Sequence, residues 1–167
     1  FNVEPGTRII LPKSVKSIMN TNGGRERLGD FGQIHPWPRT KTTTGEVYEI
    51  DRVYPNIGTH YEKYYVLDEL DEGWAALHNP ETKAVVALSF APDKVPFLGL
   101  WVNEGGYYHQ YNVALEPCTG AFDRVDMATR FDKISILPAK GSYTWHLGIT
   151  IGRKDVLCGV SPDGQLC

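Results

Sequence analysis

The acidic residue best placed for chemistry is Glu116, which closes an apolar run and directly precedes a proline. The run Tyr111–Glu116 predicts a strand. Because Pro117 has no backbone N–H to donate, we expect ladder pairing to end there and the chain to open into a loop. A carboxylate among apolar neighbours is desolvated, which moves its proton affinity toward the range of a general base. On these physical grounds alone, an ordinary strand-end acid paired with Lys or Arg is the better interpretation.

The stretch around Glu116 offers two groups that could bind a ligand and one that could act as a nucleophile. Trp101 could stack on the apolar face of a ring-shaped ligand, and Asn103 could exchange hydrogen bonds with hydroxyl groups of that ligand. A position in the core is nearly as well supported for Trp101. Cys118 lies beside Glu116, but nothing supplies the base or positive charge that a nucleophilic thiolate requires.

The elements that must position these residues are predicted to be strands. Short runs rich in Val, Ile, Tyr and Trp are separated by Gly, Pro, Asn and Asp, which is typical of an all-β chain. The clearest strand is Tyr143–Ile151, whose alternation of apolar and other residues predicts one buried face. Further strands are expected at Arg8–Leu11, Val47–Val53, Tyr61–Leu67, Trp74–His78, Ala84–Phe90, Phe97–Val102 and Lys133–Leu137.

The connections between these strands carry residues typical of turns. Asn79–Thr82 and Asn103–Gly106 predict hairpins, the second because paired glycines supply the positive φ of a tight reversal. The polar stretch Asn20–Gly45, with its Gly23–Gly24 pair, predicts a long surface excursion. Phe122–Thr129 places apolar residues at helical intervals and predicts one short helical turn.

Length and composition limit the class of protein. The 167 residues, 41% of them hydrophobic, predict one globular domain over residues 1–155 and a polar tail over residues 156–167. A formal net charge of -3 leaves no broad basic surface, so nucleic acid is not an expected partner. No stretch approaches the roughly 20 apolar residues that span a bilayer, so no membrane partner is expected either. The three cysteines are too widely spaced for a disulfide framework or a zinc site, which favours reduced thiols in a cytoplasmic protein, with a Cys158–Cys167 bridge as the alternative.

Two motifs resemble a known family. Leu-Trp-Val-Asn, followed by Val-Ala-Leu-Glu-Pro-Cys-Thr-Gly at 113–120, resembles the C-terminal signature of the aldose 1-epimerases, or mutarotases. The stretch Lys133–Trp145 resembles the pattern that closes those proteins. The resemblance extends to about Ile151 and implies a galactose-mutarotase-like antiparallel β-sandwich, or the C-terminal part of one. It also implies an isomerase that interconverts the α and β anomers of an aldose without a cofactor.

The resemblance implies roles for two proton-transfer groups. Glu116 corresponds to the base that takes the C1 hydroxyl proton, while a histidine protonates the ring oxygen. That histidine belongs to a His-Pro pair followed by an aromatic residue and often Asn, and this chain begins with Phe1 and Asn2. The resemblance therefore implies an acid histidine just upstream of Phe1. The pair His35-Pro36 lies in the polar stretch, where a turn packed by Trp37 is the better interpretation.

The sugar contacts implied by the resemblance remain open between two alignments. Residues 50–54 resemble the strand that carries an acidic sugar ligand, especially in the hexose-6-phosphate branch, and make Asp51 the first choice. A rival alignment over residues 61–65 would bring Glu62 or Lys63 to the sugar. For each, a cross-strand ion pair is the alternative. The expected partner is an aldose monosaccharide, free or phosphorylated, which the sequence does not identify.

Two further expectations concern function and assembly. The second interpretation of function is a non-catalytic carbohydrate-binding β-sandwich, which would keep a cleft and Glu116 but not the acid. A fragment of a larger sandwich would expose sheet edges and apolar surface, which could drive homo-oligomer formation.

Overall fold

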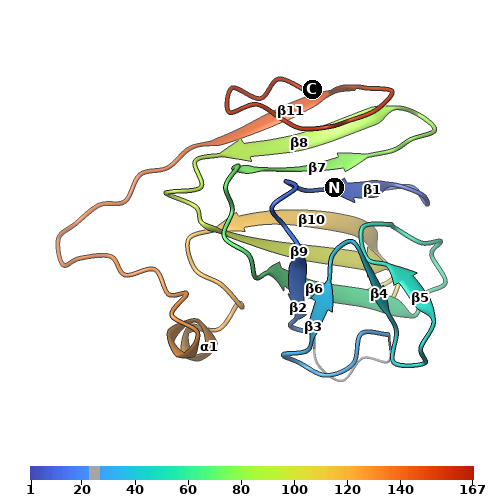
Figure 1. Cartoon of the computed structure of the whole chain (residues 1–167), viewed down its shortest axis with the longest axis horizontal. Helices are drawn as coiled ribbons and strands as arrows, with labels where there is room; N and C mark the ends of the chain where they lie inside the picture. Colours follow the sequence, from blue (N-terminus) through green and yellow to red (C-terminus); the bar gives the residue numbers. More distant parts are fainter. Residues whose placement is uncertain (23–26) are drawn as a thin grey trace.

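The computed structural model describes residues 1–22 and 27–167, and its regular secondary structure consists almost wholly of antiparallel strands (Figure 1). A five-stranded sheet has the order β10-β9-β6-β2-β3, a four-stranded sheet has the order β1-β7-β8-β11, and β4 pairs with β5. The elements are β1 (Arg8–Ile10), β2 (Ser17–Asn20), β3 (Ile34–Pro36), β4 (Arg39–Lys41), β5 (Val47–Glu49), β6 (His60–Val66), β7 (Trp74–His78), β8 (Ala84–Phe90), β9 (Phe97–Glu104), β10 (Tyr111–Cys118), α1 (Val125–Arg130) and β11 (Leu147–Arg153). The all-β prediction is confirmed, and the galactose-mutarotase-like topology stays a prediction.

The main core lies between the two larger sheets. Both contribute buried side chains to one cluster, which includes Ile9, Leu77 and Leu88 from the four-stranded sheet and Ile18, Tyr64, Leu98, Leu100, Val113 and Leu115 from the five-stranded sheet. Because successive strand residues point to opposite faces, the inward positions of Val113 and Leu115 turn Ala114 and Glu116 outward. Glu116 therefore lies on the outer face of the five-stranded sheet, the face turned away from this core.

Strand β10 continues past the proline that was expected to end it. The backbone nitrogen of Phe1 donates to the Val113 carbonyl (2.8 Å), and the Val113 nitrogen donates to the Phe1 carbonyl (3.0 Å). Alternate residues of β10 thus point their N–H groups away from β9, and Pro117 occupies one of these positions. The missing N–H falls on the outer edge of the ladder, where proline is tolerated, so Pro117 and Cys118 still pair with β9. The prediction that pairing ends at Pro117 is wrong.

The predicted excursion Asn20–Gly45 instead contains two strands. β3 pairs with β2 and β4 pairs with β5. The buried ring of His35 bonds to the Leu28 carbonyl (3.0 Å) and to the Thr40 hydroxyl (3.1 Å), which ties the segment to the domain. Each of these three-residue strands buries one residue, so a polar composition concealed them. Gly23–Gly24 lies outside the described residues.

The last strand is present, but its expected buried face is not. β11 forms the edge of the four-stranded sheet beside β8, and Ile149 and Ile151 on it are exposed. Both residues lie past the edge of the core between the two sheets, where no other element of the described residues covers them. Alternation in this strand therefore does not indicate burial. Lys133–Leu137, predicted as a strand, is irregular chain that follows α1. The predicted hairpin at Asn79–Thr82 and the short helical turn are confirmed, by the β7–β8 pair and by α1.

The C-terminal tail belongs to the domain rather than forming a polar extension. Leu157 and Val160 are buried and pack against Trp74 and neighbouring residues of β7 and β8. The Cys158 nitrogen donates to the Cys167 carbonyl (2.9 Å), which folds the tail back on itself, and the thiols of Cys118, Cys158 and Cys167 are free. In the part of the chain that the structure describes, no helix has the length and apolar character needed to cross a membrane.

Candidate functional site

The surroundings of Glu116 are set by the register of three strands. Glu116 on β10 is opposite Gly99 on β9, and Gly99 is opposite Tyr65 on β6. Lys63 precedes Tyr65 by two residues, so it points to the same outer face. Side chains from β10 and β6 therefore face each other across a glycine.

These residues form a charged cluster, which we call the Lys63 cluster: Lys63, Tyr65, Glu116 and Asp123. The ammonium of Lys63 contacts Oε2 of Glu116 and lies 3.3 Å from Oδ2 of Asp123. The Tyr65 hydroxyl donates to Oδ1 of Asp123 (2.5 Å), and the ammonium also lies 5.2 Å from the centre of the Tyr65 ring. Burial, reinforced by the bond to Asp123, raises the pKa of Tyr65 well above its usual range, so its hydroxyl stays protonated at neutral pH. Two carboxylates around one ammonium give the cluster a formal charge of about -1 at neutral pH.

Gly99 provides the space in which the cluster closes. A Cβ at this position would lie 3.0 Å from the Tyr65 ring and 3.2 Å from Oε2 of Glu116. Contacts this short force the neighbouring atoms to move. Glycine inside a strand weakens it, and here the absent side chain lets groups from non-adjacent strands meet.

The environment of Glu116 differs from the apolar one that was expected. Its side chain is 33% exposed and its carboxylate is in an ion pair with Lys63, as in the alternative interpretation drawn from the sequence. The Lys63 side chain is 13% exposed, so the partner of Glu116 is largely desolvated.

A pocket of about 340 Å³ opens beside the Lys63 cluster. Tyr65 and Glu116 line one side of it. Residues 118–121 and 123–125, Ala128 of α1 and the pair Ile134 and Ser135 complete the lining. The Glu116 carboxylate is thus at the rim of a concavity of the size that small-molecule sites have.

The fold places the candidate sugar-contacting residues of the two alignments in different parts of the protein. Asp51 lies next to β1, where its carboxylate bonds to Arg8 (3.0 Å), so it is not brought to Glu116. Burial raises the pKa of Asp51, and the charge of Arg8 partly opposes this. Glu62 points into the core, where it and Glu104, each 1% exposed, hold the guanidinium of Arg27 at 2.9 and 2.8 Å. Of the candidates from these alignments, Lys63 alone belongs to the cluster around Glu116.

Trp101 and Asn103 share the outer face of β9 but differ in access. Trp101 is partly exposed and lies opposite Lys63 and Ala114. Asn103 is fully buried, and its amide bonds to the backbone of Gly105 and Tyr107, at 3.2 Å for Gly105 and at 2.9 and 3.1 Å for Tyr107. Asn103 therefore orders the turn after β9, and a direct sugar contact gains no support from its geometry.

Cys118 lines the pocket but is not suited to nucleophilic chemistry. Burial raises the pKa of its thiol to about 11, so little thiolate exists at neutral pH. Within residues 1–22 and 27–167, no group of three or more His, Cys, Asp or Glu side chains could hold a metal ion.

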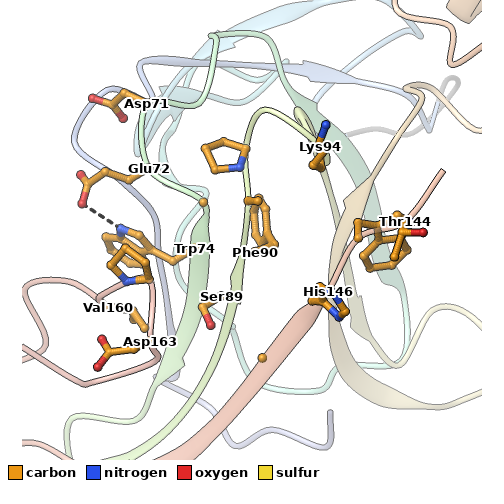
Figure 2. Close-up of a pocket in the computed structure, with 16 residues that line it drawn as sticks. Asp71, Glu72, Trp74, Ser89, Phe90, Lys94, Thr144, His146, Val160 and Asp163 are labelled. Carbon is orange, nitrogen blue, oxygen red and sulfur yellow. Dashed lines mark hydrogen bonds between the residues drawn. The ribbon is translucent and has the colours of Figure 1, made fainter.

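A larger cavity, of about 760 Å³, lies elsewhere, on the outer face of the four-stranded sheet (Figure 2). Trp74, Ser89 and Gly148 form a row across β7, β8 and β11 in its floor. Its carboxylates already have hydrogen-bond partners: that of Glu72 accepts from the Trp74 indole (3.2 Å, dashed in Figure 2), that of Asp163 from Gln165 (2.8 Å), and that of Asp71 from the Ser14 hydroxyl. The Lys63 cluster, with two carboxylates around one desolvated ammonium, is therefore the better candidate for a reactive site.

Sequence reasoning missed Tyr65, Gly99 and Asp123. Spacing of two from Lys63 could have placed Tyr65 on its face, and a glycine inside an apolar run could have signalled close approach. Asp123 lies in a turn in which it and Phe122 both have positive φ, and the alternation of apolar residues does not reveal such a turn.

Comparisons with known proteins do not assign the chain to a family. A scan against protein-family models found no match, and searches of curated proteins and of solved structures found none either. The site described above is therefore the basis for a functional hypothesis.

Proposed function

We propose that Glu116 is the general base of an aldose 1-epimerase-like site that interconverts the α and β anomers of an aldose. The observation that carries the proposal is the position of the Glu116 carboxylate, which is held by Lys63 at the rim of the 340 Å³ pocket. The resemblance of the surrounding sequence to mutarotases gives the same residue the same role.

The proposed reaction needs one base and one acid on a single bound sugar. Glu116 takes the proton of the C1 hydroxyl, C1 becomes a carbonyl, and the C1–O5 bond breaks with its electron pair going to O5. An acid gives O5 a proton. Rotation about the C1–C2 bond and reversal of the proton transfers then give the other anomer. Positioned acid and base groups each contribute typically 10²–10⁴-fold to such rates.

The acid in this proposal is the histidine that the resemblance implies upstream of Phe1. The pairing of Asn2 with Asn112, and of Phe1 with Val113, sets the direction from which an upstream residue would reach the site. In an antiparallel ladder, residues directly upstream of Phe1 would run along β10 toward Glu116. A histidine there would approach the sugar beside the base.

The second candidate is a carbohydrate-binding module without catalysis. It is favoured by the ion pair of Glu116 with Lys63, because a carboxylate held in this way can accept a hydrogen bond from a sugar hydroxyl without taking its proton.

Polarimetry separates the two functions. Freshly dissolved α-glucose, α-galactose and α-glucose 6-phosphate are followed with and without the protein, and also with a chain extended before Phe1 by the His-Pro pair that the resemblance implies. Catalysis predicts relaxation of the optical rotation faster than buffer alone for at least one sugar. Sugar binding in ligand-observed NMR without faster relaxation of the optical rotation would favour the binding module. The absence of both sugar binding and faster relaxation would refute both functions.

A further inference from the structure

An exposed aromatic cluster continues the proposed site along the outer face of the same sheet. Tyr61, Trp101 and Tyr107 contact one another, with ring centres 5.3 to 5.5 Å apart, and Tyr108 packs on Tyr107 at 4.6 Å. We call these four residues the aromatic platform. It lies on the side of the Lys63 cluster away from the 340 Å³ pocket, because Trp101 is opposite Lys63 in register.

The platform leaves apolar ring surface at the protein exterior. Tyr107 is 45% exposed and Tyr108 is more exposed still. Ala114 is opposite Trp101 on β10, and its small side chain covers little of the indole. Rings that are fixed by mutual edge contacts and partly open to water suit a flat apolar partner, such as the C–H face of a pyranose.

The turn that presents these rings is held in an uncommon conformation. Tyr108 and His109 have φ values of 48° and 56°, in the region that bulky side chains seldom adopt. The buried amide of Asn103 fixes the turn through its bonds to Gly105 and Tyr107. Strained backbone that the surrounding structure maintains is concentrated at ligand-binding sites.

Polar groups lie beside the platform in positions suited to sugar hydroxyls. Asn112, Ala114 and Glu116 alternate along β10, so all three point to the outer face. The five residues from Asn112 to Glu116, four steps along the strand, span about 14 Å, which exceeds one sugar ring. The Asn112 amide also bonds to Gln110 (3.1 Å) and would border a ring stacked on Trp101.

We infer that the sugar acted on at Glu116 is the reducing end of a disaccharide or longer chain, whose next unit stacks on Trp101 and Tyr107. This inference rests on the proposed function for the position of the first ring. The reducing unit occupies the rim of the pocket, its anomeric hydroxyl faces Glu116, and the glycosidic bond leads across Ala114 to the aromatic platform.

The test compares sugars that share a reducing unit. Rates of mutarotation are measured by polarimetry for glucose, maltose and cellobiose, and for galactose against a disaccharide with galactose at its reducing end. We expect kcat/KM to be about tenfold higher for at least one disaccharide, which corresponds to 1.4 kcal/mol. Trp101→Ala and Tyr107→Ala should each remove most of this preference, while Trp145→Ala, at an exposed tryptophan in the other cavity, should retain it. Tyr107 lies in a turn, so its variant keeps the test valid if Trp101→Ala does not fold.

The outcomes distinguish the inference from the function on which it rests. Equal kcat/KM values for monosaccharides and disaccharides, or variants that lower both alike, would overturn the platform while leaving Glu116 as a base. If no sugar relaxes faster, the proposed function fails, and calorimetric titration with maltose and cellobiose then tests only whether the aromatic platform binds sugar. Binding that Tyr107→Ala weakens about tenfold would support sugar binding by the platform. The absence of binding would overturn it.

Discussion

Replacing Glu116 by glutamine isolates the charge of the proposed base from its shape. Glutamine can still bond to Lys63, and Lys63 keeps Asp123 at 3.3 Å, so the cluster retains its arrangement. The loss of an ion pair that is a third exposed should lower the free energy of unfolding by less than about 1 kcal/mol. Loss of a general base should lower the rate by about 10²–10⁴-fold, equivalent to roughly 3–5 kcal/mol of activation free energy.

The difference between these magnitudes makes the experiment decisive. A protein with the usual stability of about 5–15 kcal/mol stays more than 99% folded after losing 1 kcal/mol, so unfolding cannot account for a hundredfold loss of rate. The assay is polarimetry on freshly dissolved α-sugar, together with urea denaturation of the same sample.

A matched control is available in Glu49→Gln. Glu49 is 26% exposed and pairs with Arg8 at 3.2 Å, so the same chemical change is made at a similar carboxylate away from the pocket. The control should retain the rate of the original protein. If Glu116→Gln also retains that rate, or if both variants lose it equally, Glu116 is not the base.

Three further predictions test the site and its support. Gly99→Ala places a Cβ 3.0 Å from the Tyr65 ring, so mutarotation should fall at least about tenfold, with a change in urea stability below about 1 kcal/mol; unchanged activity would contradict the role of this gap. Arg27→Met leaves two buried carboxylates without their cation and should cost about 3–5 kcal/mol in urea denaturation, and a loss below 1 kcal/mol would contradict the buried pairing. Because the thiolate form of Cys118 grows only as the pH approaches its pKa of about 11, iodoacetamide at pH 8 should label the two exposed cysteines first; equal labelling, measured by mass spectrometry, would show that Cys118 is not buried.

The strands that the sequence predicted best are those with both a clear pattern and clear ends. Trp74–His78 and Ala84–Phe90 have the predicted bounds, because turn residues flank each apolar run. β3 and β4 were missed because strands of three residues are too short to show alternation. For the edge strand β11 the sequence predicted a buried face that the structure does not have. Alternation indicates which side chains share a face of a strand, but not whether another layer covers that face.

The candidate site was only half predictable, because it depends on which strands become neighbours. Lys63 meets Glu116 because β6 pairs with β9, although β7 and β8 lie between them in the sequence and belong to the other sheet. Sequence periodicity places Lys63 and Glu116 on faces of their own strands, but it does not order those strands. The resemblance to mutarotases drew attention to Glu116 as a candidate base, and it offered no reason to expect that a lysine would contact this carboxylate.

The second carboxylate of the cluster explains how a base tied to a lysine could still act. Lys63 is largely buried, so a sugar that drew Glu116 away would leave a desolvated ammonium, and an uncompensated buried charge costs several kcal/mol. Asp123 already lies 3.3 Å from that ammonium and is itself fixed by Tyr65. Lys63 can therefore remain paired with Asp123 while Glu116 turns to the C1 hydroxyl, and the same exchange in reverse would return the base to its resting position when the product leaves.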